Sequence, residues 1–393
     1  MQDLIKSTLD KMDSWNTTND WKAYDPFDGL STPYTSILTL NNPILRIALQ
    51  QSVRRLPVNI RPLIGIKPAT SSKAMGFFAQ GYLTLYKIYK NDKYLSKCKF
   101  CLDWLEKNPS TGYKGYCWGN HFDYQSRGGR IPKNVPSVVW SGLIGHAFMD
   151  AYEYLKNDKY FAIAASICDF IMNDLQQSKY PNSIHIAYTP EETDSGNKGN
   201  QIHNSSAIAA SLLARVYNFN MNKNLLLLAK NAIQYTVDRQ LDDGAWYYGE
   251  KPRFHWVDSF HTGYVLESIN LYIKYSHDES YLPALKKGYS FYINTFFTPS
   301  GIPNYYHNKM RPLDIQCASQ GIQTLLNMKS YDSSSLEIAE RVALWSINNM
   351  FDTRGYFYFR KYPLMINKTP TLHWGQATMF ASLAHLLANQ LNN

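Results

Sequence analysis

The feature that most constrains this chain is a pair of helical segments that recurs along its length. The first member of each pair is rich in Gly, Ala and Ser, carries few charges and has apolar residues at helical spacing, so we expect it to be buried on most sides. These inner segments begin near Ser72, Ser137, Ile202, Ser259, Asp314 and Thr371, at intervals of 55 to 65 residues. A period of this length built from helix pairs is typical of a repeat architecture.

The second member of each pair is amphipathic, with Lys and Glu on one face, and we expect it to lie outside. These outer segments are 93–107, 159–175, 223–241, 279–297 and 334–350, and residues 43–56 can supply a sixth. Six pairs can close into a ring, which avoids the polar capping repeats that an open solenoid, the alternative, requires. The sequence therefore predicts an all-α fold, an (α/α)6 toroid or six-hairpin double ring over residues 41–393, after an N-terminal extension over residues 1–40.

The returns from each outer helix to the next inner helix are rich in aromatic residues. Each contains Gly or Pro and several Tyr, Phe or Trp, which suits turns and short hairpins, as in 111–120, 242–250, 300–308 and 354–363. In a double ring all inner helices run the same way, so their N-termini and these hairpins gather on one rim. We therefore expect a functional site on that rim.

Polar and aromatic residues concentrate where the inner segments begin and in the return before the second of them. A funnel lined by His, carboxylate, Trp, Tyr and Arg suits a carbohydrate, because aromatic faces stack on sugar rings and polar groups bind hydroxyls. The catalytic candidates are Asp258, His261, Asp123, His203 and Glu192. The candidates for substrate binding are Arg127, Trp118, Trp140, Tyr264, His373, Trp374 and Gln125.

Each candidate also has a purely structural interpretation. Asp258 stands just before a helix and can be its N-cap. His203 and His261 can be core histidines, although their equivalent places in two repeats favour function. Trp118 can be a core residue instead of a sugar platform, and Glu192 lies in a polar loop where solvated charges are the default.

Five stretches of the chain resemble a bacterial family found with surface-polysaccharide biosynthesis genes, whose members are sometimes labelled aminolevulinate dehydratase-like. They are GYCWGNHFDYQSR (115–127), IPKNVPSVVWSGLIGHAFMDAYE (131–153), ICDFIMNDL (167–175), DDGAWYYGE (242–250) and WVDSFHTGYVLESI (256–269). That family is similar in architecture to six-hairpin glycosidases, unsaturated-glucuronyl hydrolases and N-acylglucosamine epimerases. The resemblance implies an (α/α)6 toroid and assigns no role to an individual residue.

These observations predict a carbohydrate-active enzyme acting on a bacterial surface polysaccharide or its precursor. A glycoside hydrolase would use Asp258 with one of Asp123, Glu192 or Asp194 as its acid and base, and the hosting of many hydrolases by this architecture favours it. A polysaccharide lyase acting beside a uronate, or a sugar epimerase, would instead use His261, Tyr264 or His203, with Arg127 neutralising a carboxylate. A glycan-binding assembly factor without catalysis is the third alternative, and it needs only the aromatic funnel.

Other partners and cofactors find little support in the sequence. The net charge of +9 is scattered, whereas nucleic-acid binding normally needs a clustered basic stripe. Neither a phosphate loop nor HEXXH is present, so we expect no cofactor and no metal. The partner is expected to be an oligosaccharide or polysaccharide, neutral or anionic, and the oligomeric state is open. An odd number of cysteines, no secretion signal and no membrane-spanning stretch predict a cytoplasmic protein that does not insert into membranes.

Overall fold

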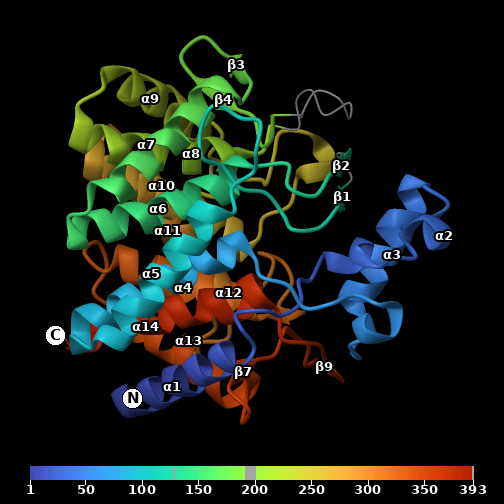
Figure 1. The fold of residues 1–393 in the computed structure, drawn as a ribbon. Coiled ribbons are helices and arrows are strands. Elements are labelled where there is room, and N and C mark those ends of the chain that lie inside the picture. Colours follow the sequence, from blue (N-terminus) through green and yellow to red (C-terminus); the bar gives the residue numbers. More distant parts are fainter. Residues whose placement is uncertain (127–128, 191–200, 392–393) are drawn as a thin grey trace.

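The inner ring consists of six helices that begin close to the six predicted starts. The computed structural model describes residues 1–126, 129–190 and 201–391. The inner helices are α4 (Ser72–Tyr89), α6 (Val138–Leu155), α8 (His203–Asn220), α10 (Ser259–Ser276), α12 (Ile315–Met328) and α14 (Thr378–Leu391). Each contacts the next in chain order and α14 contacts α4, so the ring is closed (Figure 1). The predicted (α/α)6 toroid is thereby confirmed.

Five of the outer helices occupy predicted segments. They are α5 (Asp92–Lys107), α7 (Asp158–Asn173), α9 (Lys223–Val237), α11 (Leu282–Phe296, after the 3₁₀ turn η4, Glu279–Tyr281) and α13 (Ser335–Met350). The sixth outer place, against α14, belongs to α1 (Gln2–Thr18), so the expectation for residues 43–56 was wrong. The reason is burial: α1 buries a stripe that includes Ile5, Leu9 and Met12, whereas α3 (Pro43–Arg55) buries only Gln50 and Val53. The division of the chain near residue 40 stays a prediction.

The short links between inner and outer helices repeat one local design. Each inner helix of the first four pairs ends at a residue with positive φ, which turns the chain sharply. The next residue is Asn or Asp, and its side chain accepts a backbone N–H of the following helical turn. These pairs of residues are Lys90–Asn91, Lys156–Asn157, Met221–Asn222 and His277–Asp278. The same two-residue signal therefore makes four tight corners on the rim opposite the predicted site.

Small residues let neighbouring inner helices approach closely. A Cβ atom on Gly142 would lie 2.5 Å from Cγ2 of Ile208, and one on Gly145 would lie 2.5 Å from a methyl of Leu212. Both contacts are shorter than side chains tolerate, so the packing of α6 on α8 requires glycine at these positions. The Gly and Ala content that identified the inner helices thus has a direct packing cause.

Small antiparallel hairpins lie in several of the returns, but the predicted segments 111–120, 242–250 and 300–308 contain only turns and isolated bridges. β1 (Tyr124–Ser126) pairs with β2 (Gly129–Ile131), β3 (Gln177–Lys179) with β4 (Ile184–Ile186), and β6 (Phe351–Asp352) with β7 (Tyr356–Phe357). A three-stranded sheet has β8 (Arg360–Lys361) between β5 (Leu313–Asp314) and β9 (Ile366–Asn367). The return between α9 and α10 contains the 3₁₀ turn η3 (Pro252–Phe254).

Residues 28–66, which we call the rim segment, project beyond the end of the ring that carries β1 and β2 (Figure 1). The segment contains η1 (Asp28–Ser31), α2 (Thr35–Thr39), α3 and η2 (Arg61–Ile64). It is tied internally by a buried ion pair, in which Arg61 Nε donates to Asp28 Oδ1 at 2.7 Å. Gln50 of α3 exchanges two hydrogen bonds with the backbone of Gln125 in β1, which fixes the segment to the rim.

None of the helices that the structure describes combines the length and apolar character needed to cross a bilayer.

Candidate active site

The main cavity opens on the rim where the inner helices begin. Its volume is about 780 Å³, and it is lined by inner-helix starts, by the aromatic returns and by α3 of the rim segment. It brings together seven of the predicted site residues, namely Gln125, Trp140, Asp258, His261, Tyr264, His373 and Trp374. Residues far apart in the sequence therefore meet in one concave site of a size that accommodates a small sugar.

Asp258 is at once the cap of α10 and the partner of His261. Its Oδ1 accepts the backbone N–H of His261 at 2.9 Å, and its Oδ2 lies 2.7 Å from Nδ1 of the same histidine. Trp256 Nε1 also donates to Oδ2, at 3.0 Å. Both carboxylate oxygens are thus occupied, and they hold the imidazole with Nδ1 inward, while Nε2 has no partner among the described residues.

A second carboxylate–histidine pair stands at the sixth inner helix. His373 lies in the π-helical turn η5 (Leu372–Ala377) that precedes α14, and its Nδ1 is 2.8 Å from Oδ2 of Asp25. Such turns are frequent at functional sites because they redirect single side chains. Burial lowers the pKa of His373 to about 4, with Asp25 opposing the shift. The imidazole is therefore neutral at neutral pH, and Nε2 can accept a proton.

Asp25 is buried, 1% exposed, but remains ionised. Burial by itself would raise the pKa of this carboxyl, but nearby His373 and His121 outweigh that effect and lower it. Its Oδ1 accepts the backbone N–H of Phe27 at 3.0 Å. Arg61 donates to its carbonyl at 2.8 Å, so the rim segment positions this carboxylate.

Lys73 supplies a buried cation to the same cavity. It belongs to the first turn of α4, is 6% exposed and forms no ion pair among the described residues. Burial lowers its pKa to about 8, and Asp25 opposes the shift, so the amine is still mostly charged at neutral pH. Its Nζ lies 5.2 Å from the ring centre of Tyr264. A desolvated cation without a protein partner is poised for a negative or strongly polarised oxygen of a ligand.

Other buried polar atoms of the lining also lack partners in the described structure. They include Oδ1 of Asn204 and Oε1 of Gln316, while Nε2 of Gln316 donates to the hydroxyl of Tyr264 at 3.2 Å. Trp374 packs edge-on against Phe27 and Phe260 and forms an aromatic wall. Unpaired polar groups beside aromatic faces are what a hydroxyl-rich ring requires.

Three predicted residues that the structure describes, Asp123, Trp118 and His203, are not part of the cavity lining. Asp123 binds the Arg130 guanidinium and accepts the backbone N–H of Lys133 at 2.8 Å, so its carboxylate is committed to the β1–β2 hairpin. Trp118 is 1% exposed in the core, where its indole N–H donates to the carbonyl of Leu105 at 3.1 Å. Neither Asp123 nor Trp118 is placed to meet a ligand in the cavity.

His203 lies behind the cavity wall. Its Nδ1 is 2.7 Å from the carbonyl of Tyr247, and burial lowers its pKa to about 4. It lines a separate hollow too small for a sugar, which it shares with Asp258 and His261. The remaining predicted residues, Arg127 and Glu192, fall outside the described part of the chain.

Sequence reasoning missed Asp25, Lys73 and Arg54, all of which line the cavity. Asp25 and Arg54 were assigned to an extension and to an outer helix, and Lys73 was one charge among many on a helical segment. The available signal for Lys73 was its place: it is a charged residue in the first turn of an inner segment that is otherwise almost free of charge. The predicted start of that segment was correct, so the residue could have been added by analogy with His261.

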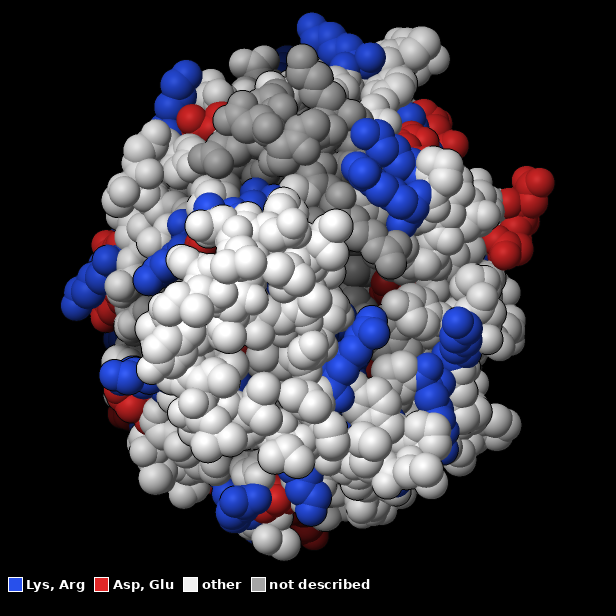
Figure 2. Space-filling model, turned by 90° about the vertical axis from the view of Figure 1, so that its right-hand side faces the viewer, with Lys and Arg blue, Asp and Glu red and all other residues white. Residues whose placement is uncertain are grey.

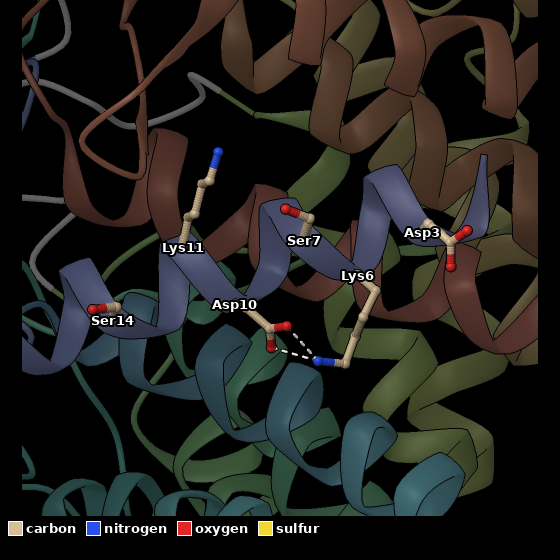
Figure 3. A pocket seen from close by; sticks show the side chains of 6 residues that line it. All are labelled: Asp3, Lys6, Ser7, Asp10, Lys11 and Ser14. Atoms are coloured by element: carbon tan, nitrogen blue, oxygen red, sulfur yellow. Dashed lines mark hydrogen bonds and ion pairs between the residues drawn. The ribbon is translucent and has the colours of Figure 1, made fainter.

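Two further hollows differ from the main cavity. One, of about 480 Å³, is lined by all six inner helices and contains His385 and the Asp150–Arg215 ion pair. The other lies on the exposed face of α1, where Lys6 pairs with Asp10 (Figure 3). All residues of the latter come from one helix, which cannot enclose a ligand. In the described part of the chain, no group of three or more His, Cys, Asp or Glu is placed to hold a metal ion.

Comparisons with known proteins show the fold. The sequence matches no protein-family model and no curated protein. A sugar epimerase from a ruminal bacterium matches with a TM-score of 0.61 and 13% identity, over 83% of this chain and 90% of that one. Cellobiose 2-epimerase from Bacillus thermoamylovorans matches with a TM-score of 0.64 and 13% identity, over 82% and 88%. A GH76 α-mannanase from Bacteroides thetaiotaomicron matches with a TM-score of 0.62 and 16% identity, over 82% and 87%. The chain therefore shares the toroid fold of these solved structures.

Proposed function

We propose that this protein is a carbohydrate-active enzyme, a sugar epimerase or isomerase that moves a proton at the carbon next to a sugar carbonyl. The observation that carries the proposal is the pair of carboxylate-bound histidines in one cavity, His261 with Asp258 and His373 with Asp25. In each, a carboxylate oxygen lies 2.7–2.8 Å from Nδ1, and Nε2 has no partner among the described residues. Two such groups supply a base and an acid for one carbon.

The reaction follows from these positions. Nε2 of neutral His373 takes the proton from the carbon beside the carbonyl, and the C–H electron pair forms a C=C bond as the carbonyl oxygen becomes an oxyanion. The charged amine of Lys73 stabilises that oxyanion. His261 then returns a proton to the opposite face of the same carbon while the oxyanion becomes the carbonyl again, which inverts that carbon. Alternatively, a proton is delivered to the former carbonyl carbon while the hydroxyl proton of the neighbouring carbon moves to the oxyanion, which exchanges aldose and ketose.

The contacts of the cavity support this chemistry over the hydrolysis that the sequence favoured. Hydrolysis requires a protonated carboxyl and a second carboxyl that activates water or attacks the sugar. Among the described residues of the lining, the only carboxylates are Asp25 and Asp258, and each is bound to a histidine. The similar solved structures include epimerases as well as a mannanase, so the fold is compatible with either reaction.

The substrate we propose is a free reducing sugar or oligosaccharide, including one derived from a bacterial surface polysaccharide. Arg54 is the reason to expect an anionic group on this substrate. Its guanidinium stacks on Phe27 at 4.3 Å, and its Nε is buried without a partner in the described structure. Such a planar donor suits a carboxylate or phosphate.

The test is proton exchange with solvent. In heavy water, a panel of reducing sugars is incubated with the protein and followed by NMR. We expect deuterium to enter the carbon next to the carbonyl as an epimer or ketose accumulates. New reducing ends without deuterium would instead identify a hydrolase, and an unsaturated uronate a lyase. Binding of sugars without any of these products would leave a glycan-binding protein and overturn the proposal.

The lowered pKa of His373 predicts the acid side of the pH profile. The base form exists above its pKa of about 4, so kcat/KM is expected to hold from neutral pH down to about 5. Below about 4 it should fall about tenfold per pH unit as the imidazole gains its proton. Initial rates across this range, with circular dichroism to check folding, measure the profile. A fall centred near the ordinary histidine pKa of about 6.5 would show that His373 is not the base.

A further inference from the structure

The rim segment carries a dense group of exposed apolar side chains. Of the 22 large hydrophobic residues exposed in the described chain, nine lie in the 30 residues from Tyr34 to Leu63. They are Tyr34, Ile37, Leu38, Leu40, Ile44, Leu45, Leu56, Val58 and Leu63, and we call them the apolar face. Five of the nine are 67–84% exposed, so they protrude into solvent and do not line a groove. Single exposed apolar residues are normal, but a cluster of this density marks an interaction surface.

The charge around the apolar face has one sign. The sequence has no Asp or Glu between Asp28 and Asp92. Within the rim segment and just after it, Arg46, Arg55 and Lys67 form no ion pair among the described residues. Figure 2, which faces the side where α2 and α3 project, shows a wide area without charged side chains, with basic and some acidic side chains near its edge.

We propose that the apolar face docks this protein on the surface of an anionic phospholipid bilayer. Protruding aliphatic side chains enter the boundary between headgroups and acyl chains, and the neighbouring cations bind the acidic headgroups. Fluid lipid adapts to protruding side chains, whereas a folded partner must supply a matching hollow for each. A second copy of the chain is disfavoured, because it would bring two sets of cations together, and the only acidic residue of each rim segment, Asp28, is buried and already paired with Arg61.

Docking would also orient the cavity. Ile47, Gln51, Arg54 and Arg55 of α3 line its mouth, so the entrance lies beside the proposed membrane contact. A glycan attached to or gathered at that surface would meet the cavity directly. This mode of contact is distinct from a spanning helix and leaves the ring outside the bilayer.

Vesicle binding without substrate tests the proposal independently of any enzymatic activity. The protein is sedimented with vesicles of equal parts phosphatidylglycerol and phosphatidylcholine, and with vesicles of phosphatidylcholine alone. We expect binding to the anionic vesicles to be at least about tenfold tighter, since each basic residue near the surface adds appreciable attraction. Raising the salt concentration several-fold should weaken it, because salt screens these charges. Equal binding to both vesicles, or none to either, would overturn the proposal.

The decisive variant is Ile44→Asp/Leu63→Asp, which places two acids on the apolar face. The replaced side chains are 74% and 84% exposed, and position 44 is in the first turn of α3, where an acid suits the helix. We expect at least an about tenfold loss of vesicle binding. The matched control, Met221→Asp/Leu227→Asp, changes side chains that are 64% and 61% exposed and lie far from the rim segment, and should bind as the wild type does.

Light scattering on the same samples decides between lipid and protein. A monomer that binds anionic vesicles supports the proposal. A wild-type dimer that the Ile44→Asp/Leu63→Asp change converts to monomer, with no vesicle binding, would assign the apolar face to a second copy. Retained vesicle binding in a folded Ile44→Asp/Leu63→Asp variant would show that another surface meets the lipid and would also overturn the proposal.

Discussion

His373→Asn is expected to lower kcat by about 10²–10⁴-fold, the share of a rate that a positioned acid or base contributes. Asn keeps a polar group of similar size beside Asp25 but cannot accept a proton from carbon. The measurement is the initial rate on whichever sugar shows deuterium exchange. His385→Asn is the matched control, because it changes a half-buried histidine of α14, the helix that follows η5, which also has a pKa of about 4 and lines the separate cavity. A loss of less than about tenfold would contradict the role of His373.

His261→Asn should have the complementary effect. With one histidine left, the enzyme can still remove and replace a proton on one face of the sugar, but it cannot complete inversion. Each single variant is therefore expected to exchange deuterium into one epimer only, and the two variants into opposite epimers. Both variants exchanging the same epimer would show that a single base performs the reaction.

Arg61→Leu should destabilise the protein by about 3–5 kcal/mol, the usual result of removing one member of a buried ion pair. Arg61 is 2% exposed, and its loss would leave the carboxyl of Asp28 buried without its cation. That carboxyl already has a pKa raised to about 6 by burial, despite the opposing effect of Arg61. Urea unfolding measures the change. Arg341→Leu, which breaks an exposed pair with Glu337, should cost less than about 1 kcal/mol.

A second change separates the lost attraction from the orphaned charge. Asp28→Asn in the Arg61→Leu background removes the unpaired carboxylate and should recover part of the stability. No recovery would mean that Arg61 acts mainly through its hydrogen bond to the carbonyl of Asp25. Because that bond positions Asp25, the Arg61→Leu variant should also lose turnover below its melting temperature.

The ring could be predicted from sequence because its signals are local. Small residues at helical spacing identified the inner helices, and the closure of six pairs required no knowledge of distant contacts. The same local logic placed Asp258, His261 and His373 on one rim. The sequence could not show that the carboxylate of Asp258 is occupied by His261 and Trp256, because that depends on side-chain orientation. These contacts are the reason that we propose proton transfer and not hydrolysis.

The errors have equally specific causes. The residues around Trp118 and Trp140 do not reveal which of the two is in the core, and only packing decides that Trp118 is in the core and Trp140 faces the cavity. Residues 43–56 have helical spacing, but an amphipathic pattern does not state which surface the helix covers. Asp25 was missed because its proposed role depends on its contact with His373, which lies far from it in the sequence.

That pairing has a consequence for biosynthesis. Asp25 leaves the ribosome before His373, and five of the six inner helices are made between them. A nascent chain can fold its early hairpins in order, but the proposed base gains its carboxylate only when the sixth inner helix closes the ring. The proposed proton transfer would therefore begin only after ring closure.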